Sequence, residues 1–351
     1  RCFLSGADYF LVCHASFVQR QFPAACLGAG PNSVPVDAMN MVAPIITIVI
    51  VNYNAGPLLR QAVQSVAEQT LGAYELLIID NASTDGSLST ISLGGPIGER
   101  CRIIRNSINT GFAAAQNQGF RIGGGRYCMS LNFDVRLSRD YLEKSLAVME
   151  STPRLGMLSG KLLRMSPDWK PTSEIDNAGL LLPHHRRPVH RGGAENDAGQ
   201  YERPVLVFGV MGAAAIYRRA MLEEVAFRDQ PFDESYFMWY EDIDLDWRAR
   251  LLGWDCLYLP SAVAYHIGDV HGHGRSDWGA QNGICNRWST IISNECPHCF
   301  LRHAWDLLKE EASLLMYVIR FGKLGPYRRA VQALAHRIPH LLEKRRWVRR
   351  H

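Results

Sequence analysis

Carboxylates follow the predicted strands of this chain at four places, and side chains in such positions can bind ligands or transfer protons. They are Asp80, Asp85, Asp134 and the pair Glu241–Asp242. A carboxylate oxygen can accept a hydrogen bond from a nucleotide base, bind a hard divalent cation or take the proton of a hydroxyl nucleophile. Any one of these residues is more often a turn former or a helix cap, so the chemical interpretation depends on their joint placement.

Three different roles fit three of these residues. Asp80 is expected to accept a hydrogen bond from the ring N–H of a nucleotide base. Asp134 is expected to bind the divalent cation that a diphosphate group requires. Asp242 is the candidate general base for a hydroxyl nucleophile.

The elements that would position these residues alternate between strands and helices. A β-branched run over 45–51 predicts a strand that is buried on both faces. Further strands are predicted over 74–80, 102–105 and 127–131, with apolar residues at helical spacing between them. Four such repeats predict an α/β fold with a doubly wound, mostly parallel sheet, in which ligands bind beyond the carboxyl ends of the strands.

The second half of the chain is organised differently. Residues 183–204 are polar and rich in His, Arg and Gly, and we expect them to form a flap over the site. The apolar segment 205–218 suits a strand and a turn near a ligand. An amphipathic helix with acidic residues in its first turn is predicted over 239–252, and a strand over 256–265 that closes at His266.

Six segments resemble family 2 glycosyltransferases, and the closest resemblance is to the rhamnosyltransferase-like branch that builds bacterial surface polysaccharides. The segments occur in the family's order and lie between about residues 45 and 290. They are 48–54 (IVIVNYN), 79–86 (IDNASTDG), 109–117 (NTGFAAAQN), 131–134 (LNFD), 232–245 (FDESYFMWYEDIDL) and 247–248 (WR).

The resemblance implies a GT-A fold, with a Rossmann-like nucleotide half and an acceptor half. It also implies the inverting transfer of a sugar from a nucleotide diphosphate donor, UDP- or dTDP-linked, with rhamnose as the first expectation. The acceptor would be a saccharide carried on a polyprenyl diphosphate lipid. The residues implied to bind the nucleotide sugar are Asn52, Asn54, Asp80, Asn109, Gly111 and Asn132.

The resemblance also assigns a metal site and a base. Residues 132–134 (NFD) stand where the family has its DxD motif, so Asp134 would bind Mn²⁺ or Mg²⁺. His266 matches a third metal-site position, and Asp242 matches the catalytic base, with Glu241 beside it. Asn132 replaces the first aspartate of the motif, which removes one negative charge from the metal site.

The net charge of the C-terminal tail is more positive than that of the whole chain. Residues 320–351 hold ten Lys and Arg against one Glu, a net charge of +9, which leaves −5 for the rest of a chain whose total is +4. Two helices are predicted from Trp305 onward. Either they pack on the catalytic domain with a solvated basic face, or they make a peripheral contact with an anionic membrane. The first helix has an apolar stripe formed by Leu307, Leu308, Ala312, Leu315, Met316 and Ile319.

Composition and length set the domain organisation. With 47% apolar and 10% aromatic residues in 351, the chain is expected to fold rather than to be disordered. We expect a poorly ordered extension over 1–40, a glycosyltransferase domain over 41–300 and a basic helical extension over 301–351. The longest apolar stretch, 42–51, is too short to cross a bilayer. Nine scattered cysteines favour reduced thiols and a cytoplasmic location. The basic tail and the lipid-linked acceptor implied by the resemblance suggest a peripheral position on the inner face of the plasma membrane.

Other classes of protein fit the residues less well. A nucleic-acid partner is not expected, since basic and aromatic residues are not interleaved. A nucleotidyltransferase would need a glycine-rich basic loop in place of 52–56, and an inert sugar-binding scaffold would be expected to lack Asp134 or Asp242. A structural zinc site is a minor alternative, because only one CxxC is present among its candidate ligands. Those candidates are Cys285, Cys296, Cys299 and His303.

Overall fold

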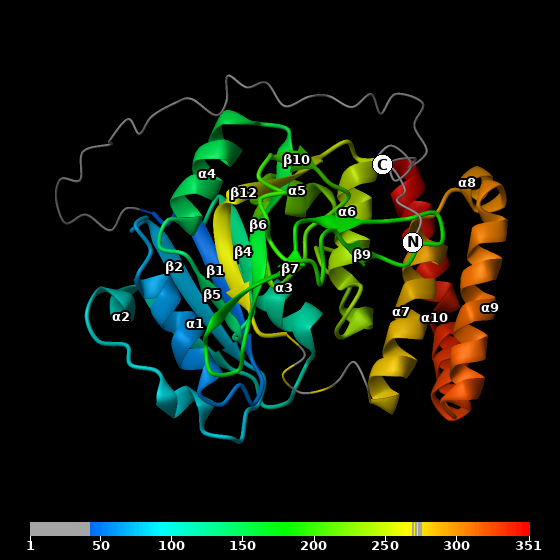
Figure 1. Cartoon of the computed structure of the whole chain (residues 1–351), viewed down its shortest axis with the longest axis horizontal. Coiled ribbons are helices and arrows are strands. Elements are labelled where there is room, and N and C mark those ends of the chain that lie inside the picture. The colour runs from blue at the N-terminus through cyan, green and yellow to red at the C-terminus, as the bar shows by residue number, and fades with distance from the viewer. Residues whose placement is uncertain (1–42, 269, 271, 273–275) are drawn as a thin grey trace.

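The computed structural model describes residues 43–268, 270, 272 and 276–351. The extension predicted over 1–40 lies outside the described residues. A ten-stranded sheet forms the centre, with helices on both of its faces and a bundle of C-terminal helices at one end (Figure 1). The prediction of an α/β fold is therefore confirmed.

The strands are β1 (Ile46–Asn52), β2 (Tyr74–Asp80), β3 (Cys101–Arg105), β4 (Tyr127–Leu131), β5 (Val135–Leu137), β6 (Leu155–Met165), β7 (Pro171–Asn177), β8 (Leu180–Leu181), β9 (Val189–His190), β10 (Val205–Leu206), β11 (Ala214–Arg218) and β12 (Asp255–His266). The helices are α1 (Leu58–Ala67), α2 (Pro96–Arg100), α3 (Phe112–Ile122), α4 (Tyr141–Ser151), α5 (Arg219–Glu224), α6 (Glu241–Leu251), α7 (Asp277–Asn294), α8 (Pro297–Arg302), α9 (Ala304–Arg320) and α10 (Leu324–Arg350).

The first half of the sheet is parallel. Every residue of β1 is buried, as expected for a β-branched strand with helices on both faces, and β1 pairs in parallel with β2 and β4. The register places Asn52 opposite Asp80 and Ile50 opposite Leu131. The carboxyl ends of these three strands therefore meet at one edge of the sheet.

The second half of the sheet is mixed rather than uniformly parallel. Strand β11 runs antiparallel to both β4 and β6, and β12 pairs in parallel with β6 but antiparallel with β5. Because Ala214 lies opposite Leu131, the loop before β11 reaches the carboxyl end of β4. Because His266 lies opposite Val135, the end of β12 reaches the segment that follows β4.

The C-terminal tail forms α9 and α10, the two helices that its apolar residues predict. Helix α10 packs along α7, and α9 lies at the outer edge of the molecule (Figure 1). Of the predicted apolar stripe, Leu307 is buried, and Leu308, Met316 and Ile319 are 60–66% exposed. Most of this stripe therefore faces solvent, because a helical period alone does not say which face of a helix meets the protein. Among the described residues, no helix is both long and apolar enough to span a membrane.

Candidate active site

The loops after β1 and β2 form one wall of the site. The Asn52 Nδ2 donates to Asp80 Oδ1 at 2.6 Å and to the hydroxyls of Ser83 and Ser87 at 3.0 and 2.9 Å. Asn52 is fully buried and Asp80 is 4% exposed. The Oδ1 of Asn54 accepts from the backbone N–H of residue 84 at 2.8 Å. The predicted nucleotide residues Asn52, Asn54 and Asp80 thus lie together in one hydrogen-bonded wall.

Asp85 has a local role in the same wall. Its Oδ2 accepts from the Gly56 N–H at 2.7 Å and its Oδ1 from the Ser87 N–H at 2.9 Å. Burial raises the pKa of this carboxyl slightly, but these hydrogen bonds outweigh it and bring the pKa below its ordinary value. Asp85 is therefore the turn residue that the local sequence suggests, and it joins the first loop to the second.

The segment with Asn109 and Gly111 connects this wall to the loop before α6. The Asn109 Oδ1 accepts from the Gly111 N–H at 2.9 Å, and the Asn81 Nδ2 donates to the Gly111 carbonyl at 3.1 Å. A Cβ at Gly111 would lie 2.5 Å from the ring of Phe237, and its φ is +87°. Glycine is thus required there both for the close approach and for the backbone conformation.

A buried carboxylate–imidazole–carboxylate chain lies where the sequence predicts the metal site. The Asp134 Oδ2 is 3.4 Å from His266 Nε2 and accepts from the Gly268 N–H at 2.9 Å. The His266 Nδ1 is 2.7 Å from Asp176 Oδ2, and Asp176 also pairs with Arg164 at 2.8 Å. Asp134 and His266 are each 4% exposed. The structure therefore brings together the two predicted metal ligands and adds Asp176 behind them.

The protonation states of Asp134, His266 and Asp176 depend on one another. Burial alone would lower the pKa of His266, but the carboxylates of Asp134 and Asp176 raise it to about 10. Burial alone would raise the pKa of Asp134, but the charge and hydrogen bond of His266 keep it below its ordinary value. A divalent cation bound by Asp134 and His266 would compete with the imidazole proton. One carboxylate and one imidazole, the latter oriented by a further carboxylate, are a donor set that fits Mn²⁺ or Mg²⁺.

Asp176→Asn is expected to weaken Mn²⁺ binding by about 10–100-fold, because the amide no longer fixes the orientation and basicity of the His266 ring. The measurement is the Mn²⁺ dissociation constant from the electron paramagnetic resonance of the free ion. Asp168→Asn is the matched control, since Asp168 is an exposed residue between β6 and β7, the strand that contains Asp176. A change of less than twofold in Asp176→Asn would show that Asp176 does not support the ion.

Asp242 lies at the second residue of α6 and holds the loop that precedes β11. Its Oδ2 accepts from the Gly212 N–H at 3.1 Å, and its Oδ1 accepts from the Ile243 N–H at 2.8 Å. One turn later, the Asp246 Oδ2 accepts from the Val210 N–H at 2.9 Å. Two carboxylates on one face of α6 therefore fix the position of this loop.

The same loop joins Asp242 to the predicted metal motif. The Asn132 N–H donates to the Ala213 carbonyl at 2.8 Å, and Ala213 directly follows the Gly212 that Asp242 holds. Asn132 in turn begins the motif that ends at Asp134. Asp242 and the metal motif thus contact neighbouring residues of a single backbone segment at the carboxyl end of β4.

Burial controls the protonation of the acidic pair on α6. Burial raises the pKa of Asp242 above its ordinary value, although the N–H groups of Gly212 and Ile243 and the nearby His190 oppose it. Burial and the neighbouring Asp242 raise the pKa of Glu241 well above its ordinary value. Glu241 Oε2 is buried and has no hydrogen-bond partner, which also fits a neutral carboxyl. Of the pair, Asp242 is therefore the carboxyl that is more readily deprotonated.

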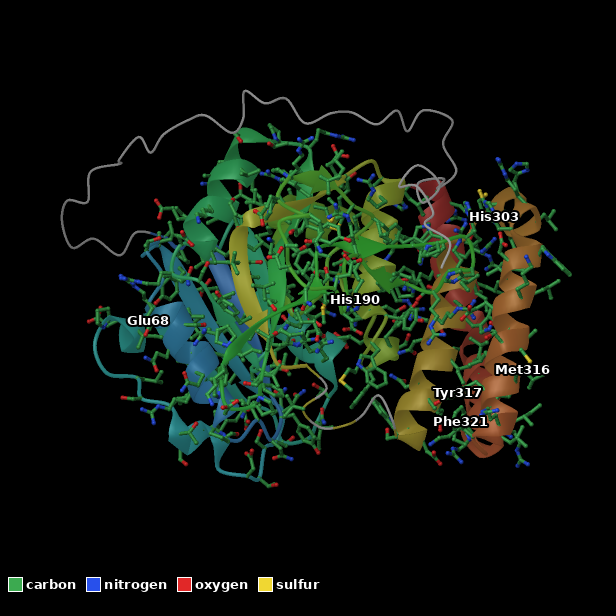
Figure 2. All side chains as sticks on the ribbon, in the orientation of Figure 1. Glu68, His190, His303, Met316, Tyr317 and Phe321 are labelled. Carbon is green, nitrogen blue, oxygen red and sulfur yellow. The ribbon has the colours of Figure 1, made fainter. Side chains whose placement is uncertain are left out.

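Besides Asp176, two features of the site were not predicted from the sequence. His190 of β9, labelled in Figure 2, brings an exposed ring near Asp242, and the only sequence signal was the His-rich character of its segment. The loop before α6 has three residues in the left-handed region, with φ from 63° to 71°. These are Phe237, Trp239 and Tyr240. The Nδ2 of Asn286 holds this loop by donating to the carbonyls of Tyr236 and Trp239 at 3.0 and 2.8 Å.

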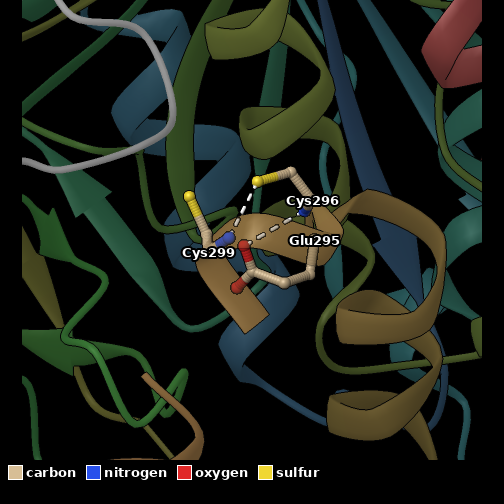
Figure 3. A group of neighbouring side chains, drawn as sticks. All are labelled: Glu295, Cys296 and Cys299. Atoms are coloured by element: carbon tan, nitrogen blue, oxygen red, sulfur yellow. Dashed lines mark hydrogen bonds between the residues drawn. The ribbon is translucent and has the colours of Figure 1, made fainter. Parts of the chain in front are cut away.

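The predicted zinc ligands do not come together as a set. Figure 3 shows the group that is present, in which possible ligand atoms lie within 4.8 Å of one another: Glu295, Cys296 and Cys299. The Cys296 Sγ accepts from the Cys299 N–H at 3.0 Å, which caps α8, and Glu295 pairs with the buried Arg186. Among the described residues, Cys101, Cys128, Cys256 and Cys285 are free cysteines.

Comparison with known proteins identifies the family. The profile described as glycosyl transferase family 2 matches residues 47–226, more than half of the chain. The chain belongs to glycosyl transferase family 2. This confirms the family expected from the sequence segments. The matched range contains Asp80 and Asp134 but ends before Asp242 and His266.

Two curated relatives are similar to parts of this family 2 chain. A putative teichuronic acid biosynthesis glycosyltransferase, TuaG, of Bacillus subtilis (strain 168) is 32% identical over 141 residues, which cover 40% of this chain and 56% of the relative. The N-acetylglucosaminyl-diphospho-decaprenol L-rhamnosyltransferase of Mycobacterium tuberculosis (strain ATCC 25618 / H37Rv) is 28% identical over 262 residues, which cover 66% of this chain and 78% of the relative. The chain thus spans little more than half of the first relative.

Solved structures support the fold. GalNAc-T7, crystallised with UDP, GalNAc and Mn²⁺, aligns with a TM-score of 0.57 at 15% identity over 72% of this chain and 48% of its own. The mannosyltransferase PcManGT from Pyrobaculum calidifontis, in complex with GDP-Man and Mn²⁺, aligns with a TM-score of 0.50 at 15% identity over 92% and 89% of the two chains. The GT-A fold expected from the sequence is thereby confirmed.

Proposed function

We propose that this chain transfers a sugar, with inversion, from a nucleotide diphosphate donor to a saccharide acceptor, and that Asp242 is the general base. One observation carries the proposal. Asp242 and the motif that contains Asp134 contact adjacent residues of the backbone segment Gly212–Ala213 at the carboxyl end of β4. This is the edge at which open α/β sheets bind their ligands.

Asp134 and His266 would hold Mn²⁺ or Mg²⁺. When bound, the ion would offset the negative charge that develops on the departing diphosphate. Asp176 supports this assignment, because it orients the His266 ring through a 2.7 Å hydrogen bond. The Mn²⁺ in the GalNAc-T7 and PcManGT structures is in accord with it.

The donor nucleotide would lie against the wall formed by the loops after β1 and β2. Asp80 would accept from the ring N–H of a pyrimidine, and Asn52, whose Nδ2 already donates to Asp80, would hold that carboxylate in position. Asn54, Asn109, Gly111 and Asn132 would border the same donor. A UDP- or dTDP-linked sugar fits this assignment, with rhamnose as the first expectation because the mycobacterial relative is named as an L-rhamnosyltransferase.

Asp242 would take the proton of the acceptor hydroxyl. The N–H groups of Gly212 and Ile243 hold both carboxylate oxygens, so the group is positioned before the acceptor arrives. The mycobacterial relative's name specifies a decaprenyl-diphosphate-linked acceptor, which supports a lipid-linked saccharide here too. Such an acceptor would place the protein at the inner face of the plasma membrane, as a peripheral protein.

A donor panel tests the function. UDP-sugars, dTDP-sugars and GDP-mannose are each added with and without Mn²⁺, and thermal unfolding is recorded. One donor should stabilise the protein only with the ion present, by about 2.7 kcal/mol at a concentration 100 times its dissociation constant. If no nucleotide sugar gives stabilisation that depends on Mn²⁺, the proposed function is wrong.

The pH dependence of transfer follows from the protonation of Asp242. Since burial raises its pKa, and a base must be deprotonated, kcat/KM should fall as the pH decreases through that raised pKa. Titratable groups that interact with Asp242 are Glu241, Asp246, Tyr240, Tyr217 and His190. His190→Gln should move the acidic limb to higher pH, because the interaction with His190 lowers the pKa of Asp242. A limb that stays in place or moves to lower pH would contradict this assignment.

A further inference from the structure

Helix α9 presents an apolar face to solvent. Side chains on this face recur every three or four residues along the helix, and most are more than half exposed. They are Trp305 (67%), Leu308 (60%), the exposed Ala312, Leu315 (42%), Met316 (66%) and Ile319 (61%). In Figure 2, Met316 lies at the outer edge of the molecule. A solvent-facing helix normally shows charged residues on this side, so a contiguous apolar stripe indicates an interaction surface.

The opposite face of α9 already has its packing partners. Leu307 and Val318 are 3% and 1% exposed. The outward stripe is therefore a second apolar face on a helix whose inner face is satisfied.

Cations predominate among the charges around the stripe. Arg302, Lys309 and Arg320 are exposed beside it. Two acidic residues of α9 are paired with arginines of the protein, Glu310 with Arg187 at 3.2 Å and Glu311 with Arg287. The third, Asp306, has a side chain that is 44% exposed and lies 4.0 Å from His303.

Aromatic and cationic side chains meet at both ends of the stripe. The Lys309 Nζ lies 5.5 Å from the centroid of the Trp305 ring, and the Arg320 Cζ lies 5.9 Å from that of Phe321. Tryptophan and long cationic side chains are the residues that settle at the boundary between lipid headgroups and acyl chains.

We propose that α9 lies in the surface of an anionic lipid bilayer, with the stripe from Trp305 to Ile319 among the acyl chains and Lys309 and Arg320 among the headgroups. Apolar residues on one side of a helix with cations at their border are features of an interfacial helix. The inference rests on the proposed function, because the lipid-linked acceptor proposed there would be held in a bilayer.

A second copy of the chain fits this face less well than lipid does. A two-fold contact would set this surface against itself, so Lys309 and Arg320 would gain no acidic partner from Glu310 or Glu311, which already pair with arginines. An anionic leaflet instead attracts each cation.

The basic helix α10 is a weaker candidate for this contact. Several of its cations are committed within the protein. Arg337 donates to Asn286 Oδ1 at 2.7 Å, Arg345 donates to the Ile292 carbonyl at 2.5 Å, and Lys344 is fully buried.

The test is flotation of the full chain with vesicles of phosphatidylcholine alone or of equimolar phosphatidylcholine and phosphatidylglycerol. The wild type should bind the anionic vesicles, and high salt should weaken that binding. The triple variant Leu308→Gln/Met316→Gln/Ile319→Gln should lose at least about tenfold in binding. Lys309→Gln/Arg320→Gln should lose the preference for phosphatidylglycerol. The control Ile122→Gln/Leu251→Gln, which changes exposed apolar residues elsewhere, should bind as the wild type does.

Two results would overturn the inference. One is that the triple variant binds anionic vesicles as tightly as the wild type. The other is that the wild type ignores vesicles while sedimentation shows a dimer that the triple variant lacks, since the stripe would then be a contact between copies. The vesicles contain neither donor nor acceptor, so the failure of this inference is separate from that of the proposed function. Stabilisation of the triple variant by donor and Mn²⁺ reports the latter.

Discussion

Asp242→Asn is expected to leave donor binding intact and to lower kcat by about 10²–10⁴-fold, the usual contribution of a positioned general base. Asparagine has nearly the same shape, and its amide oxygen can still accept from the Gly212 N–H that Asp242 accepts from at 3.1 Å. It cannot take a proton from the acceptor hydroxyl. The loop before β11 should therefore stay in place while the chemical step is lost.

The measurement for this variant pairs two readouts. Donor binding is followed by calorimetry with Mn²⁺ present, and transfer by release of the nucleoside diphosphate. Asp229→Asn is a matched control, because Asp229 is exposed and its left-handed φ of 61° is one that asparagine tolerates. If Asp242→Asn transfers sugar at the rate of the wild type, Asp242 is not the base. If the variant also loses donor binding, the result does not test the role of Asp242 as general base and shows instead that Asp242 contributes to donor binding.

Lys344→Met is expected to lower the free energy of unfolding by about 3–5 kcal/mol. The Lys344 Nζ lies 2.7 Å from both Asp233 Oδ2 and Asp244 Oδ2, and all three side chains are at most 2% exposed. Removing the ammonium group leaves two carboxylates close together in the interior. His340 on Asp233 and Arg248 on Asp244 can compensate only part of that charge.

Removing the Lys344 ammonium group should also disturb the candidate active site, because Asp244 is two residues from Asp242 on the same helix. The measurement is chemical denaturation, with Arg346→Met as the control, since Arg346 is exposed two residues further along α10. The control should change stability by no more than about 0.5 kcal/mol. A loss below about 1 kcal/mol for Lys344→Met would mean that the ammonium does not stabilise the contact between α10 and α6.

Much of the nucleotide half could be predicted because its signals are local. A run of β-branched residues can be buried only in the centre of a sheet, and the strand predicted over 74–80 has the same bounds as β2. The strand predicted over 127–131 likewise coincides with β4. The acidic residues after these strands therefore fall at the correct edge without any knowledge of the partner strands.

The features that escaped prediction depend on residues far apart in the chain. Lys344 stands among arginines and was counted with the basic surface, because its two carboxylate partners are 111 and 100 residues away. Asp176 follows no motif, and its role appears only once β7 is paired with β6 and His266 is beside it. The stripe of α9 has a clear helical period, but the period is the same whether that face meets protein, lipid or water.

The central claim is that Asp242 acts on the acceptor while the diphosphate departs on the other side of the same anomeric carbon. The most direct test is the anomeric configuration of the product, followed by proton NMR from the first turnovers with the donor that the panel identifies. The account predicts that transfer requires Mn²⁺ or Mg²⁺ and that the transferred sugar has the anomeric configuration opposite to that of the donor. A product that retains the donor's configuration would contradict a single displacement assisted by Asp242.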